Sequence, residues 1–75
     1  MWQQTHGEFK LQCWHNGLSY ELTHLPSGKQ AFVQGDDASV FEDDMATIER
    51  CYPDWDYSRV YAWLWDQCDY GSLAN

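Results

Sequence analysis

The chain has 75 residues, of which 44% are hydrophobic and 17% aromatic, and its formal net charge is −8. This length allows one domain near the lower limit for folding on a hydrophobic core alone, and the aromatic content excludes a disordered chain. Because so small a core leaves little room for a deep substrate cavity, we expect a single acidic domain over residues 1–75 that is not an enzyme.

The charge is distributed unevenly along the chain. Residues 1–35 carry two lysines and two glutamates, which cancel, whereas residues 36–75 carry ten acidic residues and two arginines and so hold the whole net charge. Such a field attracts basic surfaces and repels nucleic acid and anionic membranes. The four basic residues are scattered and form no phosphate-binding patch, so we expect no direct nucleic-acid binding.

Apolar and polar residues alternate over residues 8–15 and again over residues 18–25. A period of two predicts two strands that each bury one face. Asn16-Gly17 lies between them and is the preferred pair for a two-residue type I′ turn. This turn predicts four cross-strand pairs: His15 with Leu18, Cys13 with Tyr20, Leu11 with Leu22, and Phe9 with His24.

A third strand is predicted over residues 29–34. Pro26 and Gly28 in the preceding segment favour a turn, because proline presets φ and glycine accepts a left-handed conformation. A three-residue loop would pair Leu25 with Lys29 and would place Phe32 opposite Leu22 on the apolar face. A fourth short strand is compatible with the sequence, but no pattern requires it.

The acidic half predicts two helices, over about residues 37–50 and 54–70. The candidate N-caps of the first helix are Asp36, Asp37 and Ser39, and its expected core stripe is Phe41, Met45, Ile48 and Tyr52. Pro53 ends this helix. Three strands followed by two helices predict an α+β fold, a three-stranded antiparallel β-meander with both helices packed on one face.

The second predicted helix contains more aromatic residues than one helix face can bury. Asp54 is its expected N-cap and Gly71 its expected end. Its expected core stripe is Tyr57, Tyr61, Leu64 and Cys68, with Val60 beside it. Other aromatic residues of this segment must therefore remain partly exposed.

Neither a metal centre nor a catalytic group is indicated. The closest pair of candidate ligands is Cys13 and His15, and residues two apart on a strand are separated by about 7 Å. No Gly-x-Ser-x-Gly elbow or phosphate-binding glycine loop is present. We therefore expect no catalytic residue, no metal and no cofactor, and a metal or redox module based on Cys13 and His15 is the weakest alternative.

Three cysteines and a polar N-terminus favour a reducing, cytoplasmic setting without a membrane segment. The odd number of cysteines argues against a disulfide framework. We expect Cys51 and Cys68 to be buried as small hydrophobic residues and Cys13 to be a thiol at a strand end.

In the second half, acidic residues alternate with aromatic ones, as in Asp54-Trp55-Asp56-Tyr57. The carboxylates have one simple interpretation, which is that they only keep the protein soluble. However, the acidic excess is larger than helix capping needs, no lysine is interleaved, and exposed aromatics beside carboxylates are typical of interface hot spots. The candidate partner-binding residues are Glu42, Asp43, Asp44, Glu49, Asp54, Asp56 and Asp66 for charge, and Trp55, Trp65 and Tyr70 as aromatic anchors.

No motif assigns the chain to a family. In its length, acidity and lack of cofactor motifs it is similar to small acidic inhibitors encoded by phages, such as anti-CRISPR proteins, some of which mimic nucleic acid. This similarity implies an inhibitor that docks on the basic nucleic-acid-binding surface of a partner complex. The alternative is a homo-oligomeric structural or accessory subunit without catalysis, such as a homodimer joined through exposed tryptophans.

Overall fold

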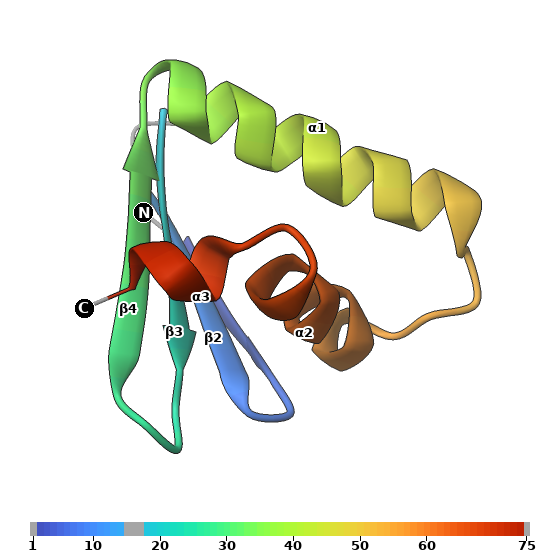
Figure 1. Ribbon diagram of the computed structural model, residues 1–75. Helices are drawn as coiled ribbons and strands as arrows, with labels where there is room; N and C mark the ends of the chain where they lie inside the picture. Colours follow the sequence, from blue (N-terminus) through green and yellow to red (C-terminus); the bar gives the residue numbers. More distant parts are fainter. Residues whose placement is uncertain (1, 15–17, 75) are drawn as a thin grey trace.

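In the computed structural model, an antiparallel sheet of four strands carries three helices on one face (Figure 1). The structure describes residues 2–14 and 18–74. The strands lie side by side in chain order: β1 (Trp2–His6), β2 (Phe9–Trp14), β3 (Ser19–His24) and β4 (Lys29–Gln34). The helices are α1 (Asp36–Cys51), α2 (Tyr57–Asp66) and α3 (Tyr70–Leu73). The α+β class is confirmed, and the predicted number of strands is corrected from three to four.

The additional strand is β1, which pairs with β2 so that His6 lies opposite Phe9. The two strands are joined by Gly7 and Glu8, and Gly7 has a φ of +60°. Glycine at the first corner is what a two-residue type II′ turn requires. Most of β1 is exposed, so it shows little of the alternation between apolar and polar residues by which a strand is predicted from sequence.

The predicted register of β2 and β3 is confirmed. Phe9 pairs with His24, Leu11 with Leu22 and Cys13 with Tyr20. A slip of one residue would move every apolar side chain of a strand to the other face, so burial of one face fixes this register. The Asn16-Gly17 turn and the pair formed by His15 lie outside the described residues.

The predicted register of β4 is wrong by one residue. The loop before β4 has four residues rather than three, and His24 pairs with Lys29, because the Gly28 N–H donates to the His24 carbonyl (2.9 Å) and closes the longer loop. Ala31 is therefore the residue that faces Leu22, whereas Phe32 lies on the opposite face and is 51% exposed.

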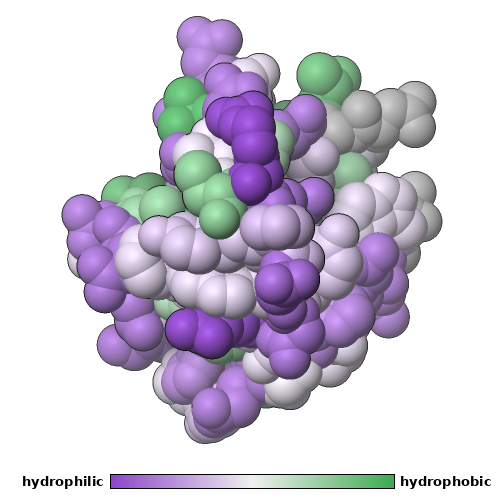
Figure 2. All heavy atoms as spheres, turned by 90° about the vertical axis from the view of Figure 1, so that its right-hand side faces the viewer, coloured by the Kyte–Doolittle hydropathy of each residue, from purple (hydrophilic) through white to green (hydrophobic). Residues whose placement is uncertain are grey.

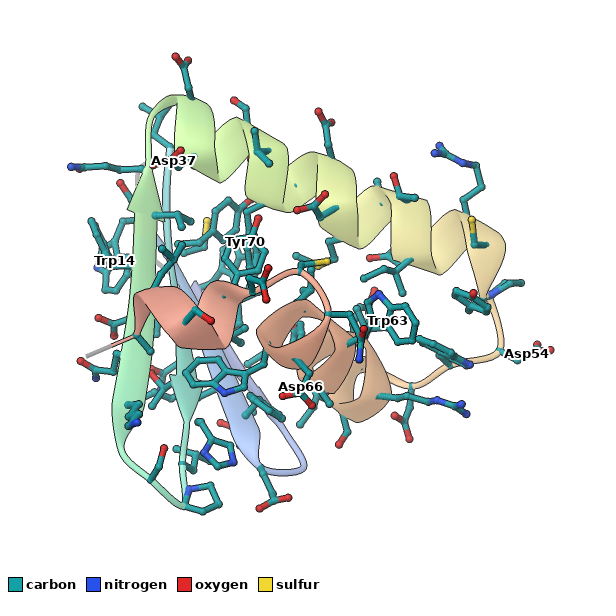
Figure 3. All side chains as sticks on the ribbon, in the orientation of Figure 1. Trp14, Asp37, Asp54, Trp63, Asp66 and Tyr70 are labelled. Atoms are coloured by element: carbon teal, nitrogen blue, oxygen red, sulfur yellow. The ribbon has the colours of Figure 1, made fainter. Side chains whose placement is uncertain are left out.

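None of the described helices covers that opposite face of the sheet, and Figure 3 shows Trp14 pointing away from all three. The Trp14 and Phe32 rings lie there with their centroids 6.1 Å apart. The helix-covered face instead supplies the core, where the largest fully buried side chains are Leu11 and Leu22 from the sheet and Phe41, Val60, Tyr61 and Leu64 from the helices. The core is thus shared between the two layers.

The helix ends differ from the predicted ones. The N-cap of α1 is Gly35, so Asp36 and Asp37 occupy the first turn, where their charges favour the helix dipole. The N-cap of α2 is Asp56 rather than Asp54, and its side chain accepts a hydrogen bond from the Arg59 N–H (2.9 Å).

The last predicted helix is split into two. The first part, α2, ends at Asp66. The chain then turns through Asp69, which has a φ of +63°, and continues as α3. Gly71 therefore lies within α3 instead of ending a helix. A Cβ at this position would come within 2.7 Å of the Trp65 Nε1 atom, so the close packing of α3 on Trp65 requires glycine.

Several residues lie at a different depth from the predicted one. Tyr52 and Tyr57 are exposed, and Met45 and Cys68 are half-buried. The cysteines are also corrected, since Cys13 is buried and Cys51 is exposed.

Candidate protein-binding surface

The two layers of the molecule differ sharply in charge. The strands and their turns hold two lysines and two glutamates, and all ten remaining acidic residues belong to residues 36–75, which form the helical layer. Figure 2 shows the side of this layer, where hydrophilic residues surround a band of residues of intermediate hydropathy. All of the predicted binding residues belong to this helical layer.

Two of the predicted carboxylates bind side chains of the protein itself. Glu42 accepts a hydrogen bond from the Tyr20 hydroxyl (3.0 Å), and Asp44 accepts one from the Tyr70 hydroxyl (2.9 Å). Both tyrosines are buried. These bonds join α1 to β3 and to α3, so Glu42 and Asp44 contribute to the packing of the layers.

The surroundings of three buried tyrosines raise the pKa values of their hydroxyls. Burial, followed by the hydrogen bond to Glu42, raises the pKa of Tyr20 well above its ordinary value. Burial, followed by the hydrogen bond to Asp44, does the same to the pKa of Tyr70. Burial also raises the pKa of Tyr61 to about 12, and its hydroxyl donates to Gln4 Oε1 (3.3 Å). All three phenols therefore remain protonated, and able to donate, to a more alkaline pH than an exposed tyrosine would.

Other predicted carboxylates are exposed, among them Asp43 and Glu49 on α1 and Asp54 in the loop before α2. Figure 3 shows Asp54 at the outer tip of this loop and Asp66 on the far side of α2 from α1. The acidic residues are thus spread around the helical layer. Asp56 is exposed as well, but one of its oxygens is engaged as the cap of α2.

The two arginines of this layer contact groups other than carboxylates. The Arg50 guanidinium donates to Thr47 Oγ1 (3.5 Å), and the Arg59 guanidinium lies over the Trp55 ring, 4.2 Å from its centroid. With ten acidic residues against these two arginines, the helical layer carries an excess of negative charge.

Three aromatic rings meet where α1 ends and α2 begins, and we call Tyr52, Trp55 and Trp63 the aromatic corner. The Tyr52 and Trp55 rings are stacked, with centroids 4.1 Å apart and planes 7° apart. The Trp63 ring lies 5.4 Å from Trp55 and 6.1 Å from Tyr52. Tyr52 is 43% exposed and Trp63 37% exposed, while Trp55 is half-buried. The corner is a closely packed aromatic surface beside Asp54 in sequence.

Of the predicted aromatic anchors, only Trp55 belongs to this corner. Trp65 is half-buried, with its ring 5.8 Å from Phe9 and 5.7 Å from His24. Tyr70 is only 6% exposed, which corrects the expectation that it is an exposed anchor. The reason is the turn at Asp69, which places Tyr70 against Phe41 in an edge-to-face contact with centroids 5.0 Å apart.

The sequence analysis missed Tyr52 and Trp63 as surface residues. Helical spacing predicts Tyr52 in the core stripe, but Tyr52 follows the last turn of α1 with a non-helical conformation (φ −134°, ψ 65°). The signal was Pro53, because the residue before a proline is driven out of the helical region. Trp63 lies on α2 between Val60 and Leu64 in sequence, and its spacing alone did not separate the exposed face from the buried one.

No other kind of site emerges from the part of the chain that the structure describes. Within residues 2–14 and 18–74, no cluster of three or more His, Cys, Asp or Glu side chains could hold a metal ion, and no pocket is found. None of the described helices has the length and apolar character needed to cross a membrane. Comparison with known proteins finds no family model, no curated protein and no solved structure that matches this chain.

Proposed function

We propose that this chain is a protein-binding module whose acidic helical layer docks on the basic nucleic-acid-binding surface of a partner complex. By occupying that surface it would keep nucleic acid away, in the manner of a cytoplasmic phage-encoded anti-defence inhibitor. The observation that carries the proposal is the aromatic corner, which belongs to a layer with ten acidic residues and only two arginines.

The exposed carboxylates would supply the charge of the interface. Asp43, Glu49 and Asp54 are exposed, so a partner lysine or arginine can reach them as it would reach a phosphate. Complementary charge of this kind speeds association and makes it sensitive to salt. The module and a nucleic acid would both bind the basic surface through negative charge. They would therefore compete for it.

The aromatic corner would supply the anchors. Aromatic side chains dominate binding hot spots because they bury a large area at a small entropic cost. Stacking of Tyr52 on Trp55, with the Arg59 guanidinium over the same indole, already holds these rings in place before binding. A pre-ordered surface loses less conformational entropy when the partner docks.

The experiment is a pull-down from a bacterial lysate with the whole chain as bait, eluted either by a salt step or by added double-stranded DNA. We expect a nucleic-acid-binding complex to elute in both cases. Trp63→Ala should lower its recovery, whereas Trp14→Ala, which removes a tryptophan from the opposite face of the sheet, should not. Recovery that resists both salt and DNA, or that falls equally in both variants, would contradict the proposal.

A further inference from the structure

β1 is an edge strand whose outer side is unpaired in the described structure. The sheet order places β1 outside β2, and all of its residues except half-buried His6 are exposed, Trp2 by 45%. An edge strand presents backbone N–H and C=O groups that can pair with another strand.

The hydrogen-bonding register shows which groups of β1 are free for such pairing. The Leu25 N–H donates to the Glu8 carbonyl (2.8 Å), so the even-numbered residues of β2 bond toward β3 and its odd-numbered residues bond toward β1. On β1, therefore, Trp2, Gln4 and His6 pair inward with Cys13, Leu11 and Phe9. Gln3 and Thr5 direct their N–H and C=O groups outward.

β1 lacks the features by which edge strands usually avoid pairing with other strands. Those features are charged side chains, prolines and bulges. Residues 2–6 contain no acidic residue, lysine, arginine or proline, and they pair with β2 without interruption. The other edge strand, β4, begins at Lys29 and has α3 lying across it (Figure 1). Of the two edges, β1 is therefore the one without an acidic residue, lysine, arginine or proline.

We propose that β1 pairs antiparallel with β1 of a second copy of this chain, so that the two sheets become one sheet of eight strands. Because Gln3 and Thr5 are the outward-bonding residues, the symmetric register that pairs all five residues of β1 places Gln4 opposite Gln4 on the twofold axis. Gln3 of each copy then faces Thr5 of the other, and Trp2 faces His6.

Every side-chain pair in this register is compatible. Gln3 with Thr5 and Gln4 with Gln4 are polar pairs that can share hydrogen bonds, and Trp2 with His6 is an aromatic pair. The Gln4 side chain also accepts the Tyr61 hydroxyl through its Oε1 atom (3.3 Å), which leaves its amide N–H groups available as donors. No like charges face each other, which matters in a chain whose net charge is −8.

The symmetry has a consequence for the acidic layer. An antiparallel pair of identical edge strands has its twofold axis perpendicular to the sheet, so the helices of both copies lie on the same face. A dimer would therefore present two helical layers side by side, with twice the net charge of −8 that one chain carries. The dimer does not need the proposed function to be correct, since it uses a different surface.

The test compares two double variants that place charge at the same two outward-facing positions. In Gln3→Glu/Thr5→Glu, each glutamate faces a glutamate of the other copy. In Gln3→Lys/Thr5→Glu, each lysine faces a glutamate, and both variants share the Thr5→Glu change, which lies opposite Lys10 of the same chain. Circular dichroism confirms that both fold, and sedimentation equilibrium at concentrations up to about 1 mM reports association even through a small interface.

We expect wild type and Gln3→Lys/Thr5→Glu to dimerise, and Gln3→Glu/Thr5→Glu to raise the dissociation constant by about tenfold or more, since like charges opposite each other destabilise a strand pair. Amide exchange at Gln3 and Thr5 should slow as wild-type concentration rises, while exchange at Gln4 stays constant. A monomeric wild type, equal association of all three proteins, or loss of the dimer in both variants would overturn the proposal.

Discussion

The sheet and the helical layer share one core but have outer faces of different character. On the sheet, the two lysines and two glutamates of residues 1–35 cancel, and the outer face pairs Trp14 with Phe32 among polar neighbours. The helical layer carries the whole net charge together with an exposed aromatic corner. Stability therefore depends on the core that both layers form, whereas the candidate binding surface consists of charges and aromatic rings that belong to the helical layer alone.

The largest expected effect tests whether the core is truly shared. Leu22 on β3 and Leu64 on α2 are both fully buried, so we expect Leu22→Ala and Leu64→Ala each to lower the free energy of unfolding by about 2–5 kcal/mol. Urea denaturation followed by tryptophan fluorescence measures this. If Leu64→Ala lowered the free energy of unfolding by well under 1 kcal/mol and Leu22→Ala did not, the sheet would be stable without the helical layer.

The next effect concerns the contact between the two layers at Gly7. A Cβ at Gly7 would overlap Ser58 of α2, whereas a Cβ at Gly28 meets no atom within 4 Å, and both glycines have a positive φ. Gly28→Ala should therefore cost about 1 kcal/mol for backbone strain alone. Gly7→Ala should cost roughly 2 kcal/mol or more, because overpacking adds to that strain. If urea denaturation gave the same loss of stability for both variants, the packing of α2 against this turn would not restrict the side chain at position 7.

The tyrosine hydroxyls that join the layers give a smaller effect. Tyr70→Phe removes the donor to Asp44, so we expect a loss of about 1–2 kcal/mol in the free energy of unfolding. Tyr57→Phe is a suitable control, because this tyrosine is exposed and the change should be close to neutral. Urea denaturation at neutral pH separates the two.

The same hydroxyls predict how stability depends on pH. The folded state raises the pKa of Tyr20 and Tyr70, so it holds their protons more tightly than the unfolded chain does. Their contribution is thus complete below the unfolded pKa of about 10 and is lost as the pH rises through the higher folded values. Tyr70→Phe should make the alkaline fall in stability shallower, and an unchanged slope would contradict this assignment.

The smallest expected effect sharpens the charge difference between the layers. Asp43→Asn/Glu49→Gln removes two charges from the helical layer and should stabilise the protein by up to about 0.5 kcal/mol at low salt, because it relieves repulsion. Glu8→Gln/Glu21→Gln removes two negative charges from the sheet, where acidic and basic residues cancel. This change should not raise the stability. Thermal unfolding at low and high salt compares them, and a gain in both would mean that repulsion is not confined to the helical layer.

The sheet was largely predictable because its rules are local. The period of two and the Asn16-Gly17 pair gave the register of Cys13 with Tyr20 correctly. The error in β4 came from a single loop residue, since a four-residue loop instead of three exchanges Phe32 with Ala31 on the buried face. β1 was missed because an edge strand with both faces largely exposed has no hydrophobic alternation to detect.

The helical layer was predicted less well because its faces depend on tertiary contacts. The position of Tyr70 follows from the left-handed turn at Asp69, which no helical spacing encodes. Two of the carboxylates chosen for binding, Glu42 and Asp44, bond to buried tyrosines instead of being free. Sequence indicates that acidic and aromatic residues are in excess, but only the packing shows which of them remain on the surface.

We propose that the acidic helical layer binds a basic partner surface. The most direct test of this claim is the salt dependence of affinity for the captured partner, measured by calorimetry for Asp43→Asn/Glu49→Gln and for Glu8→Gln/Glu21→Gln. Both variants change the net charge equally, and Asp44 is left intact because it bonds to Tyr70. We predict weaker binding and a shallower salt dependence for the helical-layer variant alone. Equal behaviour of the two variants would contradict the claim.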